Sequence, residues 1–288
     1  MDEISKIKIV INMNSPLISV VTVSYNAVDT IERTILSVLN QTYSDIEYII
    51  IDGGSTDGTV DLIKKYADKI TYWVSEPDQG IYDAMNKGID VATGEWINFM
   101  NSGDSFYRQD VLSSLFDKEI QGDVICGSTH LIEKWGSFTE TPLDLSCMKE
   151  KKPFCHQSAL VRLKWMKTMK FDIRYRICAD YDFFYKLWKQ NIPFVYTSVI
   201  VSNYDRSIGS FSGNSFVKAI QENGQISLNG GAFQSFVTTR KIICIWLRKF
   251  LVFVLPHKIW VKRKRKIMEK KDWVVSCDWM VKNGNENR

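Results

Sequence analysis

The sequence predicts an α/β fold: a doubly wound, mostly parallel sheet flanked by helices. Apolar, β-branched segments alternate with segments of helical period over the first hundred residues. Such alternation is typical of β-α-β units, whose right-handed crossovers bring the carboxyl ends of the strands to one edge of the sheet. Acid- and glycine-rich turns follow three expected strands, at 52–59, 76–88 and 101–105. Because ligands of such sheets bind at that edge, the turns predict one shared pocket for a phosphorylated ligand and a metal.

The elements of the first half follow from hydrophobic periodicity. Nearly all-apolar runs predict strands that are covered on both faces, and apolar residues three and four apart predict amphipathic helices. Asp29 is expected to cap the first helix. The expected strands are 18–24, 46–51, 70–75 and 95–100, and the expected helices are 31–39, 59–66 and 82–91.

The pattern loosens after residue 105. Helices are expected at 111–116, 158–168 and 180–190, strands at 123–126 and 194–202, a strand pair at 131–139 and a loop at 143–153. The segment 206–241 is rich in Ser, Gly and Asn, which predicts a flexible flap or linker.

Composition limits the class of protein. The chain has 288 residues, of which 45% are hydrophobic and 24% charged, as in ordinary folded soluble proteins. Its six cysteines form no CxxC pair, so we expect reduced thiols and a cytoplasmic location. The amino terminus lacks the apolar core of a signal peptide, and no run of 18 apolar residues occurs, so no membrane span is expected.

The C-terminal tail, 242–288, has a different chemistry. An apolar and aromatic stretch at 242–255 precedes eight Lys and Arg residues between His257 and Lys271. This combination predicts peripheral contact with an anionic membrane surface, at the inner face. A solvated basic face, or an apolar helix docked on the protein's own domain, is the alternative. Because no recognised reader motif accompanies the basic run, nucleic-acid binding is not expected.

Four ordered motifs resemble glycosyltransferase family 2, whose members have the GT-A fold. The motifs are SVVTVSYN at 19–26, SVLNQT at 37–42, DGGSTDGT at 52–59 and GEWINFMNSGD at 94–104. The segment GIYDAMNKG at 80–88 is similar to the polysaccharide-biosynthesis branch of that family. Ordered motifs at consistent spacing are far more specific than any one of them.

The resemblance implies a domain organisation and an activity. Residues 16–205 would form the transferase domain after an extension at 1–15, with a nucleotide-sugar-binding half at 16–105 and an acceptor half at 106–205. The implied activity is the inverting transfer of a sugar from a nucleoside-diphosphate sugar to a saccharide or lipid-linked saccharide, in surface polysaccharide biosynthesis. The alternative is a non-catalytic sugar-nucleotide or glycan-binding module.

The resemblance also implies a metal site. Asp104 matches the last acid of the family's Asp-x-Asp motif, which binds Mn²⁺ or Mg²⁺; such cations take carboxylate oxygens together with substrate phosphates. Asn101 and Gly103 stand where the family has earlier acids, which favours the non-catalytic alternative. Asn101 is expected to offer an amide oxygen at the nucleotide-sugar site. The alternative role for Asp104 is to cap the helix that follows.

Four further residues are implied in binding the nucleotide sugar. Tyr25 and Asp52 match positions that hold the base and ribose, since a tyrosine face and a carboxylate suit a uracil- or guanine-like ring. Asp78 is expected to touch the ribose or donor sugar, and Lys87 to neutralise phosphate. Packing at a strand end for Tyr25, and a solvent-facing position for Lys87, are the alternatives. Gly53 replaces a family acid, so the base preference is left open.

Asp180 matches the second acid of the family's Glu-Asp pair and is implied as the general base, which takes the proton of the acceptor hydroxyl. Ala179 stands in the place of the first acid. An acid that complements a helix amino terminus is the alternative for Asp180. His156, in a His-Gln pair similar to that of the same branch, is expected to bind phosphate or an acceptor hydroxyl, or else to be a satisfied, partly buried histidine.

Overall fold

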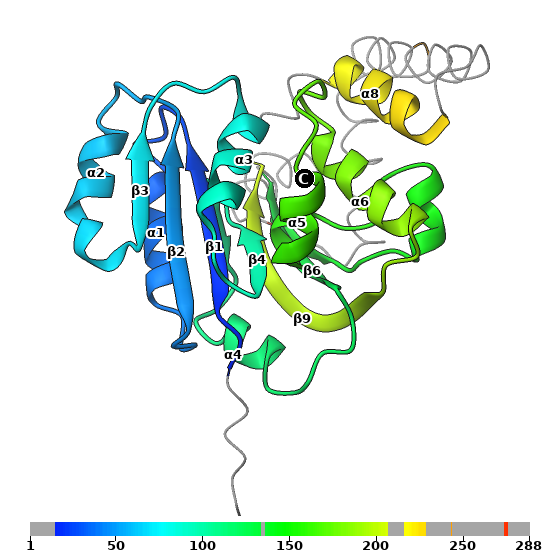
Figure 1. The fold of residues 1–288 in the computed structure, drawn as a ribbon, viewed down its shortest axis with the longest axis horizontal. Helices are drawn as coiled ribbons and strands as arrows, with labels where there is room; N and C mark the ends of the chain where they lie inside the picture. Colours follow the sequence, from blue (N-terminus) through cyan, green and yellow to red (C-terminus); the bar gives the residue numbers. More distant parts are fainter. Residues whose placement is uncertain (1–14, 134–135, 207–215, 229–242, 244–273, 276–288) are drawn as a thin grey trace, which may run out of the picture.

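The computed structural model describes residues 15–133, 136–206, 216–228, 243 and 274–275. Within these residues a ten-stranded sheet is flanked by helices on both faces (Figure 1). The strand order is β10-β7-β6-β8-β4-β1-β2-β3, while β9 pairs with β5 and β6 outside this path. The predicted α/β fold is therefore confirmed.

The first half of the sheet is parallel, as expected. β1 (Ile18–Ser24) lies between β2 (Ile46–Asp52) and β4 (Trp96–Phe99), and β3 (Tyr72–Ser75) pairs with β2. The register aligns the last residues of β1, β2 and β3 with one another. The turns that follow these strands consequently begin at one edge of the sheet.

Two hydrophobic cores lie on opposite faces of the central strands. Val21 of β1 packs in the core that contains residues of α3 and α6, whereas its neighbour Val20 packs in the core that contains residues of α1 and α4. Burial on both faces explains why these strands are mainly apolar along their whole length. The helices are α1 (Ile31–Leu39), α2 (Thr59–Lys65), α3 (Ile81–Val91), α4 (Val111–Leu115), α5 (Leu163–Met169), α6 (Ala179–Lys189) and α8 (Phe216–Leu228), with short 3-10 turns η1 (Ala67–Lys69), η2 (Leu145–Lys149) and η3 (His156–Ser158).

The second half of the sheet is mainly antiparallel. Its strands are β5 (Asp104–Phe106), β6 (Val124–Glu133), β7 (Gly136–Glu140), β8 (Ala159–Arg162), β9 (Phe194–Asp205) and β10 (Val274–Val275). β8 pairs antiparallel with β4 and β6, and β7 pairs antiparallel with β6. β6 and β9 are the parallel pair of this half. The parallel arrangement predicted from the sequence thus applies to the first half, because short connections such as that between β6 and β7 give antiparallel neighbours.

Three local expectations are corrected. The predicted helix at 158–168 is strand β8 followed by α5, because β8 is inserted between β4 and β6 and is buried. Residues 216–228, within the predicted flap or linker, form helix α8, which buries Glu222 and Ile226. The N-cap of α1 is Thr30 rather than Asp29, and its side chain makes no capping hydrogen bond within the described chain.

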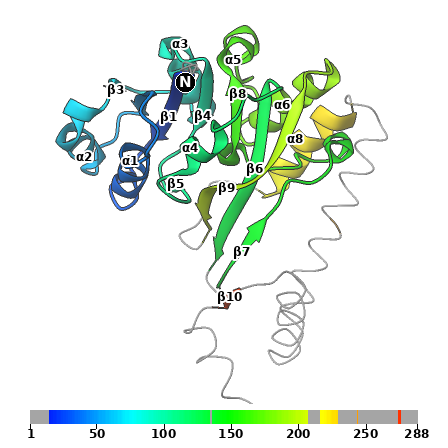
Figure 2. The ribbon, with the colours of Figure 1, turned by 90° about the horizontal axis from the view of Figure 1, so that it is seen from below.

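The predicted membrane-contacting tail lies almost wholly outside the described residues, as does the extension at 1–14. Of the tail, Val274 and Val275 are placed as strand β10, which pairs with β7 (Figure 2). Among the helices that the structure describes, none is long and apolar enough to cross a membrane.

Candidate active site

Asp52, at the end of β2, organises the turn that follows it. Its carboxylate accepts hydrogen bonds from the hydroxyls of Ser24 (2.9 Å), Ser55 (2.6 Å) and Ser75 (2.7 Å), and from the backbone N–H groups of Gly54 (3.1 Å) and Ser55 (2.8 Å). Burial raises the pKa of this carboxyl, but the hydrogen bonds outweigh burial and leave the pKa below its usual value. Asp52 is 0% exposed and shapes this turn, and its contact with the nucleotide stays a prediction.

The side chains of Tyr25 and Asp78 both lie close to Gly53. A Cβ atom on Gly53 would lie 2.5 Å from Asp78 Oδ2 and 3.3 Å from the Tyr25 ring. The Asp78 carboxylate therefore occupies the space that a side chain at position 53 would need. Tyr25 is 66% exposed, which disagrees with a packing role at the strand end. The structure thus brings together two of the predicted nucleotide-binding side chains at the open edge of the sheet.

Lys87 braces the loop that carries Asp78. Its ammonium group donates to Glu76 Oε1 at 2.7 Å and to the Pro77 carbonyl at 3.0 Å. The hydrogen bond to Glu76 raises the pKa of Lys87. The side chain is 28% exposed and its ammonium group makes two hydrogen bonds, which disagrees with the solvent-facing alternative.

Asp104 begins β5, and the N-cap of the next helix, α4, is Asp110. The helix-cap alternative for Asp104 is therefore wrong. Burial raises the pKa of the Asp104 carboxyl to about 8, although the Arg33 guanidinium opposes this shift. Gln157 Nε2 is 3.5 Å from Asp104 Oδ1. The buried acid is only weakly compensated, so it is suited to receive a cation.

Asn101 provides a second oxygen in the same turn. Its Oδ1 atom is buried and has no hydrogen-bond partner among the described residues. An orphaned buried acceptor is costly, and a hard cation or a donor group would satisfy it. No cluster of three or more His, Cys, Asp and Glu side chains in the described ranges could hold a metal ion. A cation at this turn would therefore depend on Asp104, the Asn101 amide oxygen and phosphate oxygens of a ligand.

His156 connects this turn to Asp180. Its Nε2 atom lies 3.2 Å from Asn101 Nδ2, and its Nδ1 atom lies 3.3 Å from Asp180 Oδ2. Because a carboxylate only accepts, Nδ1 carries the proton and Nε2 accepts from the Asn101 amide. Burial lowers the pKa of His156, which keeps the ring neutral near pH 7. His156 is therefore a satisfied, partly buried histidine, and it lies between two of the predicted site residues.

Asp180 is the second residue of α6, whose N-cap is Cys178, so it does not itself cap the helix. The side chain is buried, and its Oδ1 atom accepts from the Tyr82 hydroxyl at 3.2 Å and from the Tyr181 N–H at 2.7 Å. Its Oδ2 atom pairs with the Lys152 ammonium. Asp180 thus has a partner on each oxygen.

The charge of Asp180 is set by a competition between burial and its partners. Burial raises the pKa of the carboxyl, but Lys152 and His156 outweigh burial and hold the pKa well below its usual range. The group is therefore ionised at neutral pH and is able to accept a proton, as a general base must.

The sequence and the fold were compared with known proteins. A family model described as Glycosyl transferase family 2 matches residues 19–176. The chain belongs to glycosyl transferase family 2. A relative in Mycobacterium bovis, named PGL/p-HBAD biosynthesis glycosyltransferase, is 32% identical over 206 residues, which are 67% of this chain and 78% of the relative.

Two solved structures share the fold of this glycosyltransferase. TarS 1–349 of S. aureus in complex with UDP has a TM-score of 0.58 and 20% sequence identity, over 76% of this chain and 68% of that one. The mannosyltransferase PcManGT of Pyrobaculum calidifontis, in complex with GDP-Man and Mn2+, has a TM-score of 0.60 and 12% identity, over 94% and 84% of the two chains. The resemblance to the family and to its GT-A fold is confirmed.

Sequence reasoning missed two residues at the glycosyltransferase's candidate site. Lys152 lay in a segment expected to be a loop, where no periodicity or motif distinguishes it from Lys151. Tyr82 lay on a predicted helix, and its aromatic side chain was equally consistent with the core. Gln157, the partner of Asp104, was marked in the sequence only by its place in the His-Gln pair.

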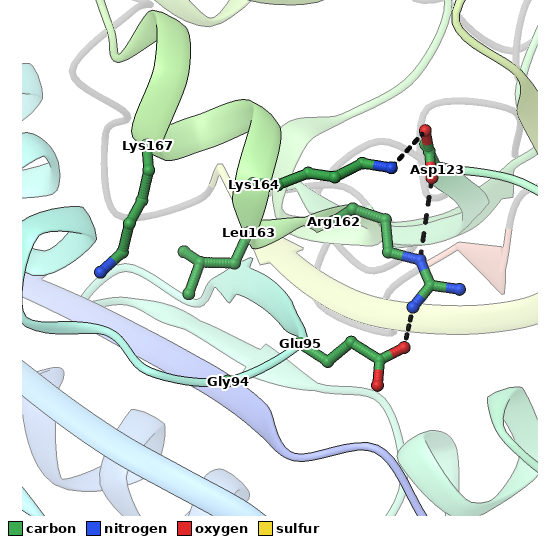
Figure 3. Close-up of a pocket in the computed structure, with 7 residues that line it drawn as sticks. All are labelled: Gly94, Glu95, Asp123, Arg162, Leu163, Lys164 and Lys167. Carbon is green, nitrogen blue, oxygen red and sulfur yellow. Dashed lines mark ion pairs between the residues drawn. The ribbon is translucent and has the colours of Figure 1, made fainter.

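A separate hollow lies at the opposite edge of the sheet, before β4 and β6 (Figure 3). Its volume is about 410 Å³, and it is lined by Gly94, Glu95, Asp123, Arg162, Leu163, Lys164 and Lys167. Arg162 pairs with Glu95 and Asp123, and Lys164 pairs with Asp123 at 3.2 Å. Because most of these charges neutralise one another, the candidate site remains the edge that carries Asp104 and Asp180.

Proposed function

We propose that the protein transfers a sugar from a nucleoside-diphosphate sugar to a saccharide or lipid-linked saccharide acceptor, with inversion at the anomeric carbon. The observation that carries the proposal is the chain of contacts from Asn101 through His156 to the ionised Asp180. It joins a candidate phosphate and metal position to a candidate base within one buried network. Membership of a transferase family supports the same activity.

The donor is proposed to bind across the ends of β1, β2 and β3. Tyr25 offers an exposed aromatic face for a base, and the carboxylate of Asp78 lies beside it. The likeness to one protein in complex with UDP and to another in complex with GDP-Man supports a nucleoside-diphosphate sugar, with either base.

Mn²⁺ or Mg²⁺ is the proposed cofactor, held by Asp104 and the Asn101 amide oxygen. A carboxylate and an orphaned amide oxygen fit the oxygen-rich environment that these cations require. When bound, such a cation would neutralise the charge of the departing nucleoside diphosphate.

Asp180 is proposed to take the proton of the acceptor hydroxyl. Tyr82 and the Tyr181 N–H orient the carboxylate through Oδ1, while Oδ2 meets Lys152 and His156. Lys152 weakens the base because it stabilises the ionised form. We expect an acceptor hydroxyl to reach Asp180 when Lys152 moves from Oδ2, which would restore basicity as the hydroxyl arrives.

The proposal also covers the pathway of the acceptor and the location of the enzyme in the cell. The acceptor would belong to surface polysaccharide biosynthesis, and the tail, 242–288, would hold the cytoplasmic enzyme at the inner membrane face. These statements rest on the resemblance to the polysaccharide-biosynthesis branch and on the charge of the tail.

A donor panel tests the proposed function. The protein is incubated with UDP- and GDP-linked sugars, with Mn²⁺, Mg²⁺ or a chelator, and both thermal stabilisation and release of nucleoside diphosphate are measured. We expect one donor class to stabilise the protein and to be turned over, in each case only with metal. Stabilisation without release under any condition, including added lipid-linked saccharides, would support the non-catalytic binding module, which Asn101 and Gly103 favour.

A further inference from the structure

Glu222 of helix α8 is a buried acid whose carboxylate binds three consecutive backbone N–H groups. Its Oε1 atom accepts from Arg176 N at 2.9 Å, and its Oε2 atom accepts from Ile177 N and Cys178 N, each at 2.9 Å. The residue is 5% exposed. Bonds from N–H groups to a carboxylate are about twice as strong as bonds between neutral groups, so this contact fixes the backbone of 176–178.

These N–H groups lead directly into the helix that carries Asp180. Cys178 is the N-cap of α6, and its carbonyl accepts the helical bond from Asp182 N at 3.0 Å. Within the described chain the Cys178 side chain makes no capping bond to its own helix. Its Sγ atom points instead to the Ala219 carbonyl of α8, at 3.5 Å. The start of α6 is therefore held by α8, which lies beside it (Figure 1).

We propose that Glu222 is a positioning residue that holds the entry of α6 and thereby keeps Asp180 in register with His156 and Tyr82. The inference rests on the proposed function of Asp180 as the base. One residue, Ala179, separates Asp180 from Cys178, whose N–H is the last that Glu222 binds. A shift of 176–178 would consequently move the Asp180 carboxylate away from His156 Nδ1, which is now 3.3 Å distant.

The contacts of Glu222 also give a role to helix α8. This helix lies outside the family match, because the match ends at residue 176. No substrate contact is proposed for α8, but its Glu222 carboxylate is buried against residues 176–178 of the acceptor half. The carboxylate places negative charge at the amino terminus of α6, where a helix dipole favours it. The transferase domain would therefore need the chain through α8, rather than ending at residue 205.

The test compares Glu222→Gln with a matched variant, Glu47→Gln. Glu47 is likewise buried and accepts from Ser19 Oγ (2.5 Å), Thr93 N (2.8 Å) and Thr93 Oγ1 (2.7 Å), but it lies at the opposite edge of the sheet. In Glu222→Gln the amide N–H₂ must face at least one backbone N–H, which cannot accept, whereas in Glu47→Gln the Thr93 hydroxyl can rotate to accept from the N–H₂. The Tm of both variants is therefore measured, so that each change in kcat is compared with the loss of stability that accompanies it.

Kinetics use the sugar nucleotide that is turned over in the donor panel. Glu222→Gln should lower kcat about 100-fold, the effect of displacing a reacting group by roughly 1 Å, while the KM for donor is retained. When Glu222→Gln is added to Asp180→Asn, kcat should fall no further, because the Asp180 carboxylate that Glu222 positions is already absent. Glu47→Gln should keep the kcat of the parent. Equal losses in the two glutamate variants, or full additivity with Asp180→Asn, would overturn the proposal.

Amide hydrogen exchange tests the positioning claim without turnover. In the intact protein the N–H groups of 176–178 should be protected although they precede the helix, and Glu222→Ala should remove this protection. Unchanged exchange in that variant would overturn the inference. If no sugar nucleotide is turned over by the parent protein, the proposed function fails, while the exchange experiment still decides whether Glu222 holds 176–178.

Discussion

His156 Nδ1 lies 3.3 Å from Asp180 Oδ2, and this contact joins two parts of the chain that sequence reasoning treated separately. On its other side the His156 ring meets Asn101, in the turn that also holds Asp104. A neutral histidine fixed in this way keeps the carboxylate and the amide in a defined arrangement. The candidate base and the candidate metal position therefore belong to one hydrogen-bonded unit.

Asp104→Asn should abolish metal-dependent binding of nucleoside diphosphate. The amide is nearly the size of the acid, and the pKa of about 8 means that the buried acid is largely neutral at pH 7 without a cation. The Tm should therefore stay close to that of the parent. Calorimetric titration with UDP and GDP, with and without Mn²⁺, measures the effect. Asp110→Asn in the same segment serves as the control, and unaltered metal-dependent affinity in Asp104→Asn would remove Asp104 from this role.

Asp180→Asn should leave donor binding intact and lower the rate of transfer by at least ~100-fold, because an amide cannot accept the proton. Tyr82 and the Tyr181 N–H can still bind the amide oxygen, so we expect the fold of α6 to be retained. Donor binding is followed by thermal shift and transfer by release of nucleoside diphosphate. Normal turnover in a less stable Asp180→Asn protein would assign Asp180 to helix stability and place the base elsewhere.

Lys152→Met should raise the pKa of Asp180 toward the ordinary value, since the nearest cation is lost. Tyr82 and His156 remain beside the carboxylate. The ionised form is the active one, so the acid limb of kcat against pH should move to higher pH. The lowered pKa of Asp180 in the folded protein also stabilises the fold at any pH above the unfolded pKa of about 3.9. This stabilisation is lost as the pH falls through the lower pKa of the folded state, so at neutral pH it is present in the parent protein and reduced in the variant. An acid limb that does not move would show that Lys152 does not control this titration.

Tyr25→Ala should weaken nucleoside-diphosphate binding by about tenfold, the lower end of what stacking on an aromatic side chain supplies. The ring is 66% exposed, so stability should change little. Tyr72→Ala, at a tyrosine of β3 that is 42% exposed, provides the comparison. Equal affinity of Tyr25→Ala and the parent for both UDP and GDP would exclude stacking on Tyr25.

The 288-residue chain should sediment with anionic lipid vesicles, and high salt should weaken this association only partly, because buried apolar groups are not screened. A chain ending near Gly231 keeps α8 and should remain soluble, bind donor and lose vesicle association. Equal vesicle binding by the two chains would reject the membrane role of the tail. Aggregation of the shortened chain would instead favour a tail packed on the domain, as the pairing of β10 with β7 suggests in part.

The first half of the fold was accessible from the sequence because its signals are local. Strands β1, β2 and β4 are buried on both faces, which makes them mainly apolar. Their turns carry glycines and acids whose spacing is itself a motif. Strand β8 was mistaken for part of a helix, because its burial depends on insertion between two strands that are distant in sequence.

The sequence by itself determined the family and the parallel half of the sheet, and it predicted Asp104, Asp180 and His156 as site residues. Only the tertiary structure decided the surroundings of each acid: Asp52 is enclosed by serines, Asp78 fills the space beside Gly53, and the partners of Asp180 hold its pKa well below the usual range. The reason is that the pKa and accessibility of a carboxylate depend on groups brought within a few ångströms by folding. Lys152 and Glu222 act from segments whose local sequence carries no sign of their partners.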